Sequence, residues 1–192
     1  MKKRNTHRLR LVAWILTVMI GVSVLCVHAG RRYILSAYPL TYTETILQMS
    51  DTYGVTPSLI AAVIRTESRF DSTAISHAGA VGLMQLTPET FDWAQSRAGV
   101  KDALGEDALT DPKVNIQYGT VTLTLLYDMF EDETAALAAY NAGQGTVKKW
   151  LTDPQYSSDG VHLTAIPYKE TAQYVKRVKT AQTIYRKFYA LA

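Results

Sequence analysis

A single glutamate at the end of an apolar segment is the clearest candidate for chemistry in this sequence. Residues 57–66 read PSLIAAVIRT, and Glu67 follows them directly. If this segment is a buried helix, the Glu67 carboxyl is partly removed from water, which disfavours its charged form and raises its pKa. Such a carboxyl can donate a proton at neutral pH, as a general acid does. The alternative is a structural role, in which Glu67 pairs with Arg65, Arg69 or a more distant arginine.

The composition argues against several other kinds of chemistry. Cys26, the only cysteine, lies in an apolar N-terminal run, and the four histidines are scattered, so we expect no metal site and no cofactor. Seven of the twenty Lys and Arg lie within the first 32 residues. The rest of the chain contains 13 Lys and Arg and 17 Asp and Glu, which gives it a net charge of −4. This charge does not favour a nucleic-acid partner.

The N-terminus has the pattern of a membrane anchor. A basic segment at 1–10 precedes an apolar run at 11–29 that contains no Asp, Glu, Lys or Arg. As a helix, this run measures about 28 Å, enough to cross the hydrocarbon core of a bilayer. We expect an uncleaved transmembrane anchor, and the alternative is a signal sequence cleaved after Ala29.

The charges that flank the apolar run predict its orientation. Five basic residues precede the run, and only Arg31 and Arg32 follow it closely. The positive-inside rule therefore places the N-terminus in the cytoplasm and the rest of the chain on the outer side of the membrane. We expect a linker at 30–41 and one folded domain at 42–192.

The domain has the pattern of a mainly α fold of short helices. The pairs Thr56-Pro57, Thr87-Pro88 and Asp111-Pro112 each combine a capping side chain with a proline suited to a first helical turn. We expect helices near 42–53, 57–66, 88–98, 112–130, 134–140, 146–151 and 167–189. The strand-like segment 80–86 is too short to anchor a sheet, and 153–164 is expected to be an exposed loop.

Four motifs in series resemble one enzyme family. They are ESRF at 67–70, GAVGLMQL at 79–86, AAYNAG at 138–143 and IPYKETAQYV at 166–175. In order and spacing they resemble the lytic transglycosylase domain, over about residues 42–189. The resemblance implies a lysozyme-like fold that cleaves the β-1,4 bond between N-acetylmuramic acid and N-acetylglucosamine in peptidoglycan and leaves a 1,6-anhydromuramyl end.

The resemblance also implies roles for individual residues. Glu67 falls on the family's catalytic acid and base, and Tyr140 on the tyrosine whose hydroxyl bonds to that carboxyl. Polar positions of the glycan groove fall on Ser76, Gln85, Asn141, Glu170 and Tyr174. Most glycosidases use two carboxylates. Here the nearest second acid, Asp71, is equally well explained as part of a turn.

The sequence thus predicts a membrane-anchored peptidoglycan lytic transglycosylase outside the cytoplasm, with glycan strands as substrate and Glu67 as its single acid and base. Two alternatives stay open. One is a lysozyme-type hydrolase on the same fold, which would activate water, and the other is a wall-binding protein without activity. Protein partners cannot be inferred from the motifs.

Overall fold

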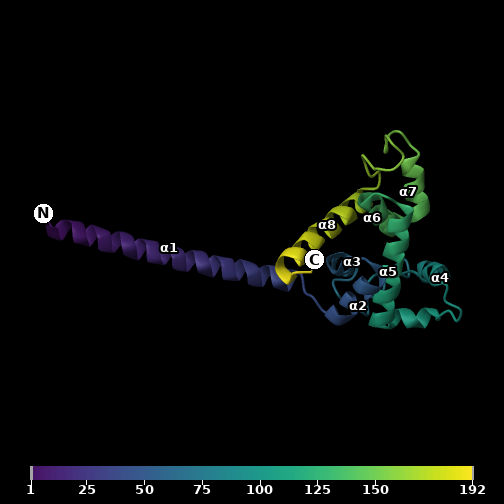
Figure 1. Cartoon of the computed structure of the whole chain (residues 1–192), viewed down its shortest axis with the longest axis horizontal. Helices are drawn as coiled ribbons and strands as arrows, with labels where there is room; N and C mark the ends of the chain where they lie inside the picture. Colours follow the sequence, from purple (N-terminus) through teal and green to yellow (C-terminus); the bar gives the residue numbers. More distant parts are fainter. Residues whose placement is uncertain (1, 192) are drawn as a thin grey trace. The chain divides into compact units, whose positions relative to one another are not determined.

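The computed structural model describes residues 2–191, except the side chains of 2–9 and 11. The chain divides into one unit that ends at Tyr38 and a second that begins at Pro39. The first unit is a continuous helix, α1 (Lys2–Ala37) (Figure 1). Its part Val12–Ala37 has a mean hydropathy of 2.2 and no buried residues, so it is long and apolar enough to cross a membrane.

Helix α1 continues beyond the apolar run. The sequence predicts a linker at 30–41, but the helical backbone extends to Ala37. Residues 31–36 contain no helix-breaking residue, whereas Pro39 lacks a backbone N–H and disfavours helical geometry in the residue before it. Residue 29 therefore marks the end of the charge-free run and not the end of the helix.

The second unit is mainly helical, as the sequence predicts. Its described elements, in chain order, are α2 (Thr43–Tyr53), α3 (Pro57–Glu67), α4 (Pro88–Arg97), the 3-10 helix η1 (Glu106–Thr110), α5 (Pro112–Met129), α6 (Glu133–Ala142), α7 (Gln144–Leu151) and α8 (Lys169–Tyr189). Helix α5 contacts α2, α4, α6 and η1, and α3 packs along α8 (Figure 1).

The three cap-and-proline pairs all begin helices. The Asp111 carboxylate accepts hydrogen bonds from the N–H groups of Lys113 and Val114, at 2.7 and 3.2 Å. The Thr87 hydroxyl accepts one from the N–H of Thr90 at 3.2 Å. These side chains satisfy backbone donors that have no partner within the helix, which fixes where α5 and α4 start.

The region between α3 and α4 is a folded turn with minimal β structure. Its described ladder consists of two isolated antiparallel bridges, Ile75 with Val81 and Val81 with Leu86. The expectation that this segment is too short for a sheet is confirmed. Backbone hydrogen bonds within the turn pair many of its groups, and side chains from the helices satisfy some of the others.

Asn115 of α5 holds this turn in place. Its side chain is fully buried. Its Oδ1 accepts from the N–H of Met84 at 2.8 Å, and its Nδ2 donates to the carbonyls of Val81 and Leu109 at 2.9 and 3.0 Å. One amide therefore joins the turn, η1 and α5. The approach is so close that a Cβ on Gly82 would lie 2.3 Å from Asn115 Nδ2.

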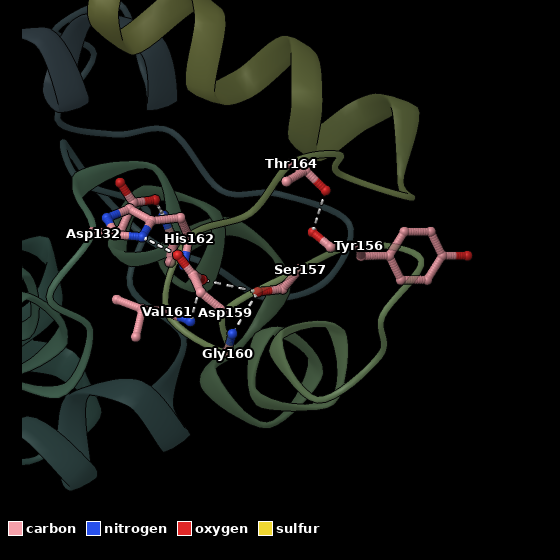
Figure 2. A network of polar contacts seen from close by, with 9 residues as sticks. Asp132, Tyr156, Ser157, Asp159, Gly160, Val161, His162 and Thr164 are labelled. Atoms are coloured by element: carbon pink, nitrogen blue, oxygen red, sulfur yellow. Dashed lines mark hydrogen bonds and ion pairs between the residues drawn. The ribbon is translucent and has the colours of Figure 1, made fainter.

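The loop 152–168 is exposed, as expected, but it is internally hydrogen-bonded (Figure 2). The Asp159 carboxylate accepts from the N–H groups of Val161 and His162, at 2.8 and 2.7 Å, and contacts His162 Nδ1 at 2.7 Å. The two N–H groups hold the pKa of Asp159 well below its usual range. At the base of the loop, the Thr164 hydroxyl donates to the Tyr156 carbonyl at 3.0 Å.

We predict that Gly82→Ala destabilises the second unit by at least about 2 kcal/mol more than Gly79→Ala does. Both glycines have left-handed φ values, 78° and 79°, so alanine is strained at either position by about 1 kcal/mol. Only at Gly82 would the new Cβ also collide with Asn115 and with the Leu109 carbonyl. Urea unfolding of the full chain in detergent measures both changes, and equal losses would show that the Asn115 contact is not tight.

Candidate active site

Glu67 is the last residue of α3, a helix whose first eight residues are all buried. Its carboxyl faces a cavity on one side and is surrounded by protein on the others. This burial raises the pKa of the Glu67 carboxyl from 4.5 to about 7. The nearby Tyr174 hydroxyl and the charge of Arg177 lower this pKa, but their effects are smaller. At neutral pH both protonation states of Glu67 are therefore populated.

The cavity has a volume of about 720 Å³, within the range of ligand sites. Its walls come from the end of α3, the turn before α4, and helices α4, α5, α6, α7 and α8. The residues that line it are Glu67, Ser76, His77, Ala78, Ala80, Gln85, Leu86, Thr87, Glu89, Thr90, Trp93, Thr122, Leu126, Ala139, Tyr140, Asn141, Gly143, Gln144 and Glu170. Glu67 thus opens into a groove that is lined by both polar and apolar side chains.

Two tyrosines lie near Glu67, and their hydroxyls differ in role. The resemblance predicts a bond from Tyr140 to Glu67, but the Tyr140 hydroxyl donates to the Met84 carbonyl at 2.9 Å. Tyr174 is 2% exposed, and its hydroxyl has no hydrogen-bond partner within ordinary distance limits among the described residues, but it lies near enough to Glu67 to lower the pKa of that carboxyl. The Glu67 charge raises the pKa of both tyrosine hydroxyls, so α6 and α8 each place a hydroxyl near Glu67.

Tyr174 is expected either in the groove wall, among the substrate-binding positions, or directly behind that wall. It is buried and does not line the cavity, so it lies behind the wall. Burial and the nearby Glu67 charge raise the pKa of the Tyr174 hydroxyl well above its usual value, so it stays protonated and can donate. Its position is that of a residue that acts through Glu67 rather than on a ligand.

Gln85 and Ser76, two of the expected substrate-binding residues, both line the cavity. The Gln85 amide nitrogen donates to the carbonyls of Ala74 and Gly82, at 3.1 and 2.9 Å, which leaves its Oε1 without a partner among the described residues. Its backbone is left-handed, with φ of 49°. Strain of this kind concentrates at functional positions. The Ser76 hydroxyl accepts from the N–H of Ala80 at 3.0 Å and stabilises the turn.

Asn141 and Glu170 also line the cavity, at the opposite wall. The Asn141 Oδ1 accepts from the Thr171 hydroxyl at 2.8 Å, which joins the end of α6 to the start of α8. A second hollow of about 550 Å³ adjoins this wall and shares both residues. The bond between Asn141 and Thr171 thus holds the end of α6 beside the start of α8, where Glu170 lies.

Asp71 does not line the cavity. Its carboxylate accepts from the hydroxyl and the N–H of Thr73, at 2.7 and 2.9 Å, and these bonds lower its pKa. The turn interpretation thus accounts for this residue. Among the described residues, no group of three or more His, Cys, Asp or Glu is arranged to hold a metal ion.

Several cavity residues lie outside the motifs. Glu89, Thr90, Thr122 and Gln144 line the groove, yet sequence analysis does not identify them. A helical face formed by positions 89, 90 and 93 was the available signal, but it becomes informative only when the orientation of α4 is known.

Comparison with known proteins agrees with this geometry. The family model described as the transglycosylase SLT domain matches residues 44–162. The soluble lytic murein transglycosylase of Salmonella typhimurium is 33% identical, over 87% of this chain and 26% of its own length. The membrane-bound lytic murein transglycosylase C of Actinobacillus pleuropneumoniae is 32% identical, over 75% of this chain and 45% of its own length.

Solved structures show the same likeness. The crystal structure of the 70-kDa soluble lytic transglycosylase of Escherichia coli matches with a TM-score of 0.72 and 29% identity, over 87% of this chain and 28% of that one. The structure of an inactive Glu-to-Gln mutant of the lytic transglycosylase Slt of Pseudomonas aeruginosa matches with a TM-score of 0.69 and 32% identity. The match covers 80% of this chain and 25% of that one. This chain spans between about a quarter and a half of the length of these relatives. The matched family model and the shared lysozyme-like fold show that the chain belongs to the transglycosylase SLT domain family.

Proposed function

We propose that this protein is a peptidoglycan lytic transglycosylase in which Glu67 is the single general acid and base. The observation that carries the proposal is the Glu67 carboxyl, which opens into the groove and has a pKa of about 7. The names of the relatives, soluble and membrane-bound lytic murein transglycosylase, support peptidoglycan as the substrate. That a Glu-to-Gln mutant of one relative is inactive supports a glutamate in the central role.

In the proposed reaction the protonated Glu67 carboxyl gives its proton to the oxygen of the β-1,4 bond between N-acetylmuramic acid and N-acetylglucosamine. The C–O bond at muramyl C1 breaks, and the N-acetylglucosamine chain leaves with a hydroxyl. The Glu67 carboxylate then accepts the proton of the muramyl C6 hydroxyl while that oxygen bonds to C1. The product carries a 1,6-anhydro ring, no water is consumed, and Glu67 is protonated again.

The surrounding residues take supporting roles in this proposal. Tyr174 orients the Glu67 carboxyl and moderates its pKa. Tyr140 fixes the turn through the Met84 carbonyl. Gln85 lines the groove, and its Oε1, which has no partner among the described residues, accepts a hydrogen bond from the glycan, while Asn141 and Glu170 contact the glycan from α6 and α8. Ser76 contributes chiefly by holding its turn.

We further propose that α1 anchors the domain to the cytoplasmic membrane. The apolar part of α1 is of spanning length, and one relative is named as membrane-bound. The excess of basic residues before the apolar run supports a single span with the N-terminus in the cytoplasm. The catalytic domain, 42–192, then works on the wall side, with the peptidoglycan strands and the membrane as its partners.

The first prediction concerns the product. The full chain in detergent, incubated with purified peptidoglycan, should release muropeptides with 1,6-anhydromuramyl ends, and Glu67→Gln should reduce release by at least about 1,000-fold because it removes the only acid and base. Mass spectrometry identifies the ends. Reducing ends, heavier by one water, would assign the protein to the hydrolases, and binding without release would favour a wall-binding protein.

The second prediction concerns stability. A folded pKa of about 7 against 4.5 when unfolded means that ionising Glu67 opposes folding. This loss is absent below pH 4.5, grows as the pH rises towards 7 and is constant above it. Glu67→Gln should therefore be more stable than the native chain above pH 7, by up to about 3 kcal/mol, and equally stable below pH 4.5.

Urea unfolding between pH 4 and pH 8 measures this difference. Glu89→Gln removes a carboxylate from the wall of the same cavity and controls for a general loss of negative charge. A Glu67→Gln variant that is less stable than the native chain at pH 8 would instead make Glu67 a structural residue, held by the arginines around it.

The third prediction distinguishes the two tyrosines. Tyr174→Phe removes the nearby hydroxyl that lowers the pKa of the Glu67 carboxyl. The alkaline limb of the pH–rate profile should then move to higher pH, by about half a pH unit or more. Tyr140→Phe should move it less, because that hydroxyl bonds to the Met84 carbonyl. Initial rates between pH 5 and pH 9 provide the measurement. A larger shift in Tyr140→Phe than in Tyr174→Phe would contradict this prediction and support a hydrogen bond between Tyr140 and Glu67.

A further inference from the structure

We propose that one face of α4, formed by Glu89, Thr90 and Trp93, is a sugar-binding subsite that stacks an N-acetylglucosamine ring on the Trp93 indole. This inference rests on the proposed function, since it assumes a glycan in the groove. It adds residues that lie outside the four motifs and states which of the two sugars they hold.

Helical geometry separates α4 into three faces. Glu89, Thr90 and Trp93 stand at positions i, i+1 and i+4 and line the cavity. Phe91, Ala94 and Gln95 are buried on the core side. Asp92 and Ser96 are exposed. Trp93, half-buried, thus lies on the groove side of α4 and does not belong to the core face.

The cavity face of α4 is held firmly at both ends. At the start, the Thr87 hydroxyl bonds to the N–H of Thr90 and, at 2.9 Å, to its hydroxyl. Near the end, the buried Gln95 amide accepts from the N–H of Leu104 at 2.6 Å and donates to its carbonyl at 3.1 Å. A platform that is ordered before binding loses little conformational entropy when a ligand arrives.

The chemistry of this face matches a sugar ring. The indole offers a flat apolar surface for the C–H side of a pyranose, together with an N–H donor at its edge. One turn earlier, the Glu89 carboxylate can accept hydrogen bonds from sugar hydroxyls. A stacking surface beside a strong acceptor is the combination that a polyhydroxylated ring requires.

Charge selects between the two sugars of the glycan. Among the described residues, no Lys or Arg lines the cavity, while Glu89 and Glu170 do. A muramyl ring without a peptide carries a free lactyl carboxylate, which Glu89 would repel at close range. N-acetylglucosamine is neutral. The ring on Trp93 is therefore N-acetylglucosamine.

The test uses the full chain in detergent, with Glu67→Gln to prevent turnover and the tetramer of N-acetylglucosamine as the probe. Binding should give a saturable change in tryptophan emission, which Trp93→Phe abolishes while calorimetry still detects binding. Trp93→Ala should weaken binding about tenfold, and Trp93→Phe less, because phenylalanine keeps an aromatic face. Asp92→Ala, on the exposed face of the same helix, should change neither reading.

A second measurement tests the choice of sugar. The neutral tetramer should bind more tightly than a peptide-free tetrasaccharide of alternating N-acetylglucosamine and N-acetylmuramic acid, and Glu89→Gln should reduce that ratio by severalfold. An unchanged ratio would overturn the assignment of N-acetylglucosamine to this face.

The inference and the proposed function fail in different ways. If the native chain releases anhydromuramyl ends while Trp93→Ala binds the tetramer with full affinity, or while no variant binds it, the α4 subsite is wrong and the enzyme assignment stands. If the native chain releases no glycan fragments, the proposed function is wrong, whatever the fluorescence shows.

Discussion

The structure depends on the burial of α3. Eight consecutive residues of this helix are enclosed, and α8 packs along it. A helix so deeply buried cannot turn its last residues out into bulk water, and Glu67 therefore ends beside the groove with little solvent around it. Desolvation of its carboxyl follows from the packing of apolar side chains up to three turns away. The raised pKa that makes Glu67 a candidate acid thus results from the packing of the core.

The turn before α4 is held by polar side chains in place of a sheet. Ser68 donates to the Leu83 carbonyl at 2.8 Å, Tyr140 donates to that of Met84, and Asn115 binds the turn on both sides. The Val81 carbonyl also accepts from the N–H of Leu86, whereas the bonds to the Leu83 carbonyl, the Met84 carbonyl and the Met84 N–H satisfy backbone groups that would otherwise need another partner. Because they come from α3, α6 and α5, the shape of the turn, and with it Gln85, depends on three helices at once.

Because the turn depends on contacts with three helices, only the features that follow from local sequence could be predicted. Helix starts follow from local signals, and the cap-and-proline pairs placed them correctly. Glu67 follows from an apolar run that ends in an acid. The partner of the Tyr140 hydroxyl could not be predicted from sequence, because only the folded turn shows that it donates to the Met84 carbonyl. The short helix Glu106–Thr110 was also missed, since it lacks an apolar period.

Burial at the end of α3 and the side chains of α8 shift the pKa of the Glu67 carboxyl in opposite directions. A carboxyl that must first give and then accept a proton works best with a pKa near the working pH. With its ordinary pKa of 4.5, Glu67 would be protonated in fewer than about 1 in 100 molecules at neutral pH. If burial acted alone, the pKa of the Glu67 carboxyl would be higher, and the group would release its proton less readily in the first step. Tyr174 and the exposed Arg177, both on α8, lower this pKa again. In the proposed mechanism, the burial provided by α3 thus keeps Glu67 protonated at neutral pH, and α8 helps it to release the proton.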